Sequence, residues 1–176
     1  MSGANLPEVW LRGPVAGVHP LLQPAAHALL QAAEECQRAG ASLSAAELWS
    51  APGGAAPAGF HLRHIAGVID RLLTYARGEP LDGRQLAALA REGQPGDPPA
   101  EASVLLADVE AAVAVALGVL RATTPESLGE PRAVGRAGLP STVHGLLFHL
   151  AEHAQRHAGQ LVTTVKVVRG TAATGR

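Results

Sequence analysis

The chain has 176 residues, a formal net charge of −1, and 47% hydrophobic, 16% charged and 3% aromatic residues. This balance excludes a disordered chain, which would be less hydrophobic and more highly charged. With so few aromatic residues, the core must be built from Leu, Val, Ile and Ala, which favours helices over strands. We therefore expect an all-α protein with a single domain over residues 1–176 and a core at about residues 20–168.

The same composition excludes several classes of partner and of cellular location. The single lysine is Lys166 and the arginines are scattered, so the chain lacks the basic cluster that nucleic acid requires. No uninterrupted apolar run reaches the roughly 18 residues of a membrane span, and Met1–Glu8 does not resemble a signal peptide. Cys36 is the only cysteine, which excludes an internal disulfide, and we expect it to fill the core. We expect a cytoplasmic protein whose partner is a small molecule.

Apolar residues recur at spacings of three and four in four segments, which is typical of one helix face. These segments run over about residues 20–38, 57–77, 100–122 and 141–168. Shorter helices are expected within residues 42–49, where Ser44 and Glu47 have capping-box spacing, and near residues 83–91. We expect an extended piece near residues 132–136, an N-cap at Ser141 and frayed residues 170–176.

Four amphipathic helices predict a four-helix bundle with short extra helices in its connections. The connection between the second and third long helices, at about residues 79–99, is too long for a tight antiparallel turn. It could carry the chain back along the bundle and make these two helices parallel. Because Ala-rich helices that pack closely often dimerise, we also expect a homodimer.

Histidine clustering is the main chemical signal, since five of the eight histidines fall within residues 61–64 and 149–157. Residues four apart lie one helical turn apart on the same face, so His153 and His157 project side by side and can hold one metal ion. His149 extends the row by a turn, but the row then spans about 12 Å along the helix axis, so at most two of the three bind one ion. A third ligand must come from another helix, where His61 and His64 are available. We prefer His64, because it is deeper in its helix and leads into the apolar row towards Tyr75.

Three neutral imidazole nitrogens with an open fourth position are the pattern of catalytic zinc. Nickel, iron and manganese also accept imidazoles, and spacing does not choose among them. The string from His149 to His153 also matches the H-x-x-E-H pattern of one metalloprotease class, with Glu152 as general base. Those enzymes take a further acidic ligand downstream, and no Asp or Glu follows His153 here. We reject that alternative, although it marks Glu152 and His149 as residues near the metal.

Two stretches resemble the DinB/YfiT-like family of metal-dependent enzymes. The run Glu-His-Ala-Gln-Arg-His-Ala-Gly-Gln at residues 152–160 resembles the family's closing-helix signature, and residues 64–67 and 70–78 resemble its second-helix segment. The resemblance implies an up-down-down-up four-helix bundle, with nickel or zinc held by His64, His153 and His157. It also implies chemistry such as transfer or isomerisation dependent on a low-molecular-weight thiol, and a homodimer.

Two functions remain in competition at this point. In the first, a metal-dependent hydrolase or thiol transferase uses the ion to activate water or a thiol, with Glu152, His149 or Tyr75 passing a proton. In the second, the protein is a non-catalytic bundle that is stabilised by the metal or senses a metal or ligand. An open coordination position favours the enzyme, whereas a fourth ligand such as His149 or His61 favours the structural role.

Overall fold

The computed structural model describes residues 6–174, and the side chains of residues 6–170. Within this range the chain forms mainly helix, with one small antiparallel pair of strands. The α-helices and strands are α1 (Gln23–Gly40), α2 (Ala45–Leu48), α3 (Ala58–Ala76), α4 (Gly83–Ala90), α5 (Ala102–Ala122), β1 (Pro131–Val134), β2 (Leu139–Thr142) and α6 (Val143–Thr174). Single 3-10 turns lie at Val9–Leu11, Pro20–Leu22, Pro52–Gly54 and Pro125–Gly129.

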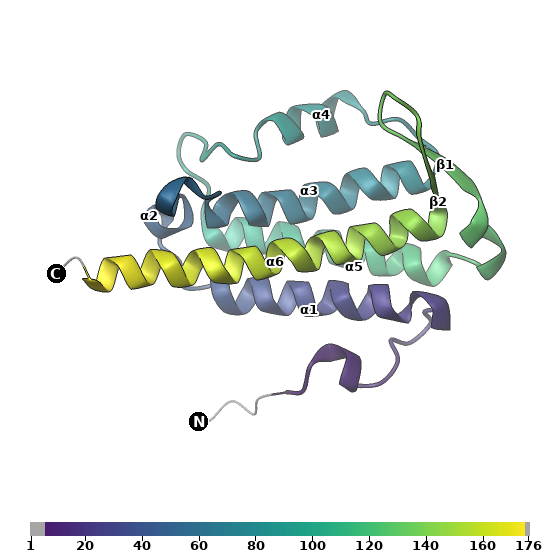
Figure 1. Ribbon diagram of the computed structural model, residues 1–176, viewed down its shortest axis with the longest axis horizontal. Coiled ribbons are helices and arrows are strands. Elements are labelled where there is room, and N and C mark those ends of the chain that lie inside the picture. Colours follow the sequence, from purple (N-terminus) through teal and green to yellow (C-terminus); the bar gives the residue numbers. More distant parts are fainter. Residues whose placement is uncertain (1–5, 175–176) are drawn as a thin grey trace.

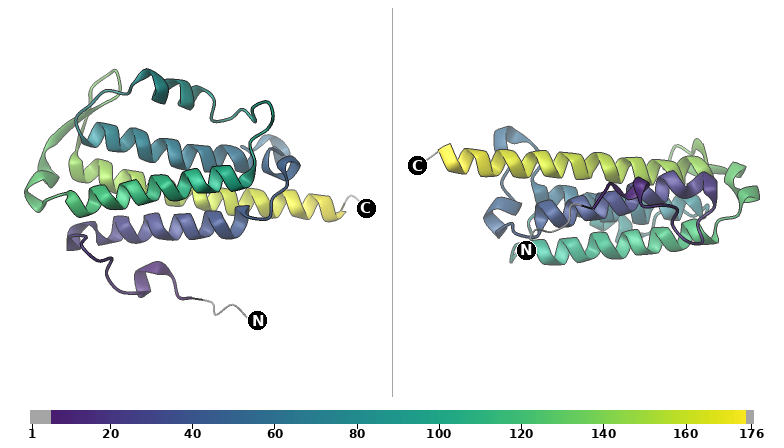
Figure 2. Two further views of the ribbon diagram at one scale, coloured as in Figure 1. Left: turned by 180° about the vertical axis from the view of Figure 1, so that it is seen from behind. Right: turned by 90° about the horizontal axis from the view of Figure 1, so that it is seen from below.

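The four long helices α1, α3, α5 and α6 lie side by side (Figures 1 and 2). Helix α6 packs against both α3 and α1, and α5 packs against the same two helices from the other side. The connection from α3 to α5 runs along the outer side of α3 and contains α4 (Figure 1). This connection matters for function, because it brings residues that follow α4 against the middle of α3.

The core follows the apolar faces expected from the sequence. Its largest fully buried side chains come from all four long helices and include Leu29, Leu62, Ile65, Ile69, Leu120, Leu147, Leu150 and Leu161. Full burial of each such side chain contributes about 1.5–3 kcal/mol to folding. Cys36 is also fully buried, and burial raises the pKa of its thiol to about 12. Cys36 therefore fills the core as expected, since a thiol with such a pKa is not a nucleophile at neutral pH.

The expected short helices are present and are capped by their own side chains. Ser44 and Glu47 form the predicted capping box at α2. Asp82 and Gln85 form a second capping box at α4. Gln85 is buried, and its Nε2 also donates to Asp70 Oδ2 and Thr74 Oγ1, both at 2.8 Å. Its side chain therefore both starts α4 and ties it to α3.

The segment before α6 differs from the expectation of an all-α chain. Residues 131–134 and 139–142 pair as an antiparallel hairpin, with Arg132 opposite Ser141. The extended piece expected near residues 132–136 is thus one strand of a sheet. The prediction of Ser141 as N-cap is wrong, because Ser141 lies within β2. The hydroxyl of Thr142 instead accepts from the Gly145 backbone N–H at 3.0 Å.

Helix α6 is longer than its sequence pattern indicates. It continues past residue 168 to Thr174, so the expectation of fraying from residue 170 is wrong over the described part. Residues 175–176, which that expectation also covered, lie outside the described residues.

Helix α5 is the one helix in the described part of the chain that is long and apolar enough to cross a membrane, judged by length and composition. Its sequence is interrupted by Asp108 and Glu110, so it contains no uninterrupted apolar run of that length. The face that carries Leu105, Val109 and Leu120 is buried against the other long helices. A core helix of this kind passes the same test of composition, and the expected absence of a membrane partner stays a prediction.

Candidate metal centre

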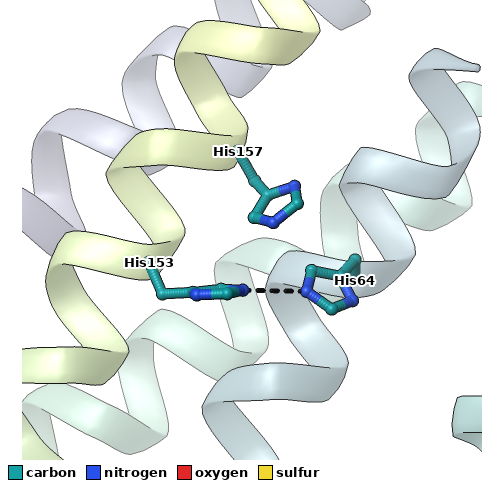
Figure 3. Close-up of side chains that lie close together, drawn as sticks. All are labelled: His64, His153 and His157. Carbon is teal, nitrogen blue, oxygen red and sulfur yellow. Dashed lines mark hydrogen bonds between the residues drawn. The ribbon is translucent and has the colours of Figure 1, made fainter. Parts of the chain in front are cut away.

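Three histidines from two helices converge in the middle of the helical body. Helix α3 supplies His64, and α6 supplies His153 and His157, which lie one turn apart on the face that also buries Leu150 and Leu161. One ring nitrogen from each of the three lies within 4.8 Å of the others. Figure 3 shows the three rings turned towards one another across the gap between the two helices. The structure therefore brings together the three residues that the sequence selected.

The distances suit one small ion. His64 Nε2 lies 2.9 Å from His153 Nε2, and the His157 ring centroid lies 4.4 Å from that of His64 and 4.7 Å from that of His153. Two nitrogen ligands on a tetrahedral ion with bonds of about 2.0–2.1 Å lie about 3.3 Å apart. Small side-chain movements would therefore allow these three histidines to hold a divalent ion between them. Nitrogen donors of this kind suit zinc or nickel and also accept iron or manganese.

The electrostatic setting keeps the α6 histidines neutral. Burial, together with the neighbouring His64, lowers the pKa of His153 to about 4. Burial and then His64 likewise lower the pKa of His157 to about 4. Both imidazoles are therefore uncharged at neutral pH, which is the form that binds a metal ion.

Glu92 contacts the centre and was missed by the sequence analysis. It follows α4, is only 5% exposed, and places Oε2 2.7 Å from His64 Nδ1 and Oε1 2.6 Å from Arg71 Nη1. Burial raises the pKa of the Glu92 carboxyl, but hydrogen bonds from His64 and Arg71 outweigh burial and hold that pKa below its usual range. An ionised carboxylate only accepts, so His64 donates through Nδ1. The residues lie 28 positions apart and share no local motif that would have signalled the contact.

His61 lies behind His157 rather than between the three rings. Its Nδ1 is 3.1 Å from Nδ1 of His157, and its side chain is buried. Burial lowers the pKa of His61, and His64 adds to this effect. Because the contact uses Nδ1 of His157, Nε2 is the nitrogen that remains to face the other two rings. His61 thus touches a metal-ligand candidate from its far side.

Comparison with known families agrees with this geometry. The family model of the DinB superfamily matches residues 22–161. The chain belongs to the DinB superfamily. The matched range contains all three histidines and Glu92, and it bears out the resemblance seen in the two sequence stretches. No curated protein matches the chain.

The proton-transfer candidates of this DinB-superfamily chain lie at different distances from the centre. His149 and Glu152 lie beside His153, with the His149 ring centroid 5.2 Å from that of His153. The Glu152 carboxylate accepts from Arg156 Nη2 at 2.6 Å and contacts His149 Nδ1 at 2.8 Å, and the hydrogen bond from Arg156 lowers the pKa of Glu152. Tyr75 lies eleven residues beyond His64 in α3, about 16 Å along the helix axis. The structure therefore does not bring Tyr75 to the three histidines.

A surface hollow opens next to His157. Its volume is about 610 Å³, and it lies between the start of α3, the preceding loop and the middle of α6. The exposed lining is mostly apolar, with polar groups from Arg156, Gln160, two histidines and two threonines. It comprises Ala55, Ala56, Phe60, His61, Arg156, His157, Gly159, Gln160, Thr163 and Thr164. A small organic molecule in this hollow would lie against one of the three histidines.

The remaining histidines have other surroundings. His19 Nδ1 accepts from the Leu21 backbone N–H at 3.3 Å, and His27 Nε2 lies 3.0 Å from the Gly13 carbonyl oxygen. His144 is exposed at the start of α6. These three lie outside the candidate centre.

Proposed function

We propose that this DinB-superfamily protein is a metal-dependent enzyme. His64, His153 and His157 would hold one divalent ion, most simply zinc or nickel, with iron or manganese as alternatives. The observation that carries the proposal is the convergence of three histidines, two of them kept neutral by burial, beside an open hollow. Three protein ligands leave at least one coordination position for a reacting molecule.

The chemistry we propose is activation of water or a thiol for hydrolysis or group transfer. A bound divalent ion lowers the pKa of a coordinated water or thiol and so supplies a nucleophile at neutral pH. The protein's own residues orient the reactants. The hollow beside His157 accepts a small molecule, including a low-molecular-weight thiol, and Phe60 and two alanines form its apolar wall.

Proton transfer is assigned to the polar pair next to His153. Glu152 is ionised and therefore an acceptor, while His149 is half-exposed and contacts it, so the pair can carry a proton from the site to solvent. The distance of Tyr75 from the centre argues against a direct role for it.

We also propose a topology, an oligomeric state and a cellular location for the protein. The long connection through α4 supports an up-down-down-up bundle, with α3 and α5 parallel (Figure 1). We propose a homodimer, on the basis of the Ala-rich helix surfaces. We also propose that the protein is cytoplasmic and has no membrane partner, on the basis of its interrupted apolar runs, and that it has no nucleic-acid partner, on the basis of its scattered arginines and single lysine.

The competing function is a non-catalytic bundle that is stabilised by its metal or senses it. The core favours the enzyme, because it is closed by apolar side chains from all four long helices without help from the metal centre. A chain folded in this way should not require an ion to keep its fold, in contrast to small domains that unfold when their metal is removed.

Metal removal tests the proposal. The purified protein is treated with a chelator, and helix content by circular dichroism, bound metal by elemental analysis, and turnover are measured before removal, after removal and after reloading with zinc or nickel. Turnover is followed with 4-nitrophenyl acetate as a hydrolysis probe and with glutathione plus 1-chloro-2,4-dinitrobenzene as a thiol-transfer probe. We expect a folded, inactive metal-free protein that regains turnover on reloading. Loss of helix content on chelation would overturn the proposal in favour of a structural metal.

A further inference from the structure

We propose that Glu92 is a positioning residue that holds the His64 imidazole with Nε2 directed at the metal, and that Arg71 and Gly67 hold Glu92 in place. The inference rests on the proposed metal site and deepens it. It assigns a role to the buried ion pair between Arg71 on α3 and Glu92 in the connection after α4, a connection that carries none of the three candidate ligands.

The contacts of the His64 imidazole define both its tautomer and its orientation. Glu92 Oε2 lies 2.7 Å from Nδ1, so the carboxylate holds the proton on Nδ1 and leaves the lone pair on Nε2. It is Nε2 that lies 2.9 Å from His153 Nε2, on the side where the three rings meet. The ring is also stacked on Phe60, with centroids 5.2 Å apart and an interplanar angle of 17°. One edge and one face of His64 are thus fixed. A metal-binding histidine whose other nitrogen donates to a carboxylate is a better oriented and more basic ligand.

The Glu92 carboxylate is itself held by an ion pair with Arg71. A buried carboxylate needs partners, and Arg71 Nη1 donates to Oε1 at 2.6 Å while Oε2 is used by His64. Arg71 is also buried, so the two opposite charges compensate each other away from water. Arg71 lies seven residues after His64, two turns along the same face of α3. Helix α3 therefore presents both partners of the carboxylate.

Gly67, which lies between His64 and Arg71 on α3, leaves room for this ion pair. A Cβ atom at this position would lie 2.5 Å from Glu92 Oε1 and 2.7 Å from Arg71 Nη1. The Gly67 backbone is ordinary helix with a negative φ, so its conformation does not require glycine. Glycine in a helix interior is otherwise unfavourable compared with alanine. The space taken by the ion pair is the physical reason for glycine here.

The segment that carries Glu92 is attached to α3 by hydrogen bonds. Arg63, one residue before His64, donates to the backbone carbonyls of Arg91, Gln94 and Pro95. The chain on both sides of Glu92 is therefore tied to α3 next to His64. His153 lacks an equivalent support, because its buried Nδ1 has no hydrogen-bond partner among the described residues. His64 is thus the one of the three that a buried carboxylate orients.

The test compares two isosteric changes, Glu92→Gln in the buried pair and Glu152→Gln in the exposed carboxylate next to His153. Zinc affinity is measured by competition with a chromophoric chelator. We expect Glu92→Gln to weaken zinc binding about 10- to 100-fold, the usual effect of losing such a partner, and Glu152→Gln to change it less than about threefold. Gly67→Ala should weaken binding in the same direction, because it displaces Glu92 without removing any polar group.

A readout that needs no variant is the tautomer of His64 in the metal-free wild-type protein, measured by nitrogen-15 NMR of the imidazoles at pH 7.5. We expect the proton on Nδ1. A proton on Nε2, or equal zinc affinity for wild type, Glu92→Gln and Gly67→Ala, would overturn the inference. Failure of the wild-type protein to bind zinc or nickel would overturn the proposed function instead, and the tautomer would still decide the role of Glu92.

Discussion

Two clusters of the same three residue types adjoin His153 of the candidate metal centre, one through His64 and the other through His149. On the α3 side, His64, Glu92 and Arg71 are linked by contacts of 2.7 and 2.6 Å. On the outer side of α6, His149, Glu152 and Arg156 are linked by contacts of 2.8 and 2.6 Å. The contact distances in the two clusters are almost equal, but the exposures differ. The Arg71 and Glu92 side chains are 9% and 6% exposed, whereas those of Arg156 and Glu152 are 51% and 33% exposed.

Burial, rather than bond length, separates the two clusters in their expected effects. Water screens the exposed cluster, so its ion pair should contribute less than about 1 kcal/mol to stability. Breaking the buried pair leaves an uncompensated charge in the interior, which typically costs several kcal/mol. The buried cluster also fixes the ring of a candidate metal ligand, while the exposed cluster stands next to the site and is free to exchange protons with solvent.

The largest expected difference is in metal binding when the histidine of each cluster is removed. His64→Ala should weaken zinc binding more than about 100-fold, because loss of a ligand exceeds the 10- to 100-fold effect of losing a ligand's partner. His149→Ala should change it less than about tenfold. Equilibrium dialysis with elemental analysis measures both, and His144→Ala is the control for removal of an exposed histidine. Equal losses for His64→Ala and His149→Ala would show that the ligands are wrongly assigned.

The next difference is in stability when the arginine of each cluster is replaced. Arg71→Met should lower the free energy of unfolding by about 3 kcal/mol, since Glu92 is left buried without its countercharge. Arg156→Met should lower it by less than about 1 kcal/mol. Urea unfolding of the metal-free proteins, followed by circular dichroism, gives both values. A loss for Arg71→Met as small as that for Arg156→Met would contradict the importance given to burial.

A pH effect is expected from the histidines that lie between the two clusters. The pKa values of His153 and His157 are lowered from 6.5 to about 4 in the folded protein. Between these values the unfolded chain binds protons that the folded protein does not, so the stability of the metal-free protein falls as pH decreases from about 6.5 to 4. Urea midpoints at pH 7.0, 5.5 and 4.5 measure this. The doubly substituted His153→Gln, His157→Gln protein should show a smaller decrease, and an unchanged decrease would mean that other groups cause it.

The smallest effect concerns salt. The coupling free energy between Glu152 and Arg156 in a double-mutant cycle should be below about 1 kcal/mol and approach zero in 1 M NaCl, where the Debye length is about 3 Å. The coupling free energy between Glu92 and Arg71 should be unchanged in about 1 M NaCl, because dissolved ions screen a buried pair much less than an exposed one. A salt-sensitive coupling for Glu92 and Arg71 would indicate that this pair is open to solvent.

The sequence predicted the helical part of the fold well, because each long helix carries a continuous apolar face with helical spacing. It was wrong around Ser141, since local preference for a cap competes there with pairing between two strands, which depends on residues about ten positions away. The length of α6 beyond residue 168 was also missed, because the apolar face fades there while the helix continues.

Spacing alone could predict only the part of the candidate site that lies within one helix, and the choice of His64 also relied on its position in its own helix and on the family resemblance. His153 and His157 lie one turn apart in one helix, and Glu152 and Arg156 share that helix, so spacing alone places them together. The partner of His64 could not be found in this way, because Glu92 lies in an irregular segment whose path depends on tertiary packing. Glycines inside helices do not signal such a contact either, because an added Cβ atom would meet Glu92 at Gly67 but would meet nothing at Gly118 or Gly159.

The central claim is that His64, His153 and His157 bind one divalent ion and leave a position open. X-ray absorption at the metal edge of the zinc-loaded protein tests it most directly. The account predicts three imidazole nitrogens at about 2.0–2.1 Å, with the remaining position taken by a light atom that an added small thiol replaces with sulfur at about 2.3 Å. A fourth imidazole that the thiol does not displace, or a site with fewer than three imidazoles, would contradict it.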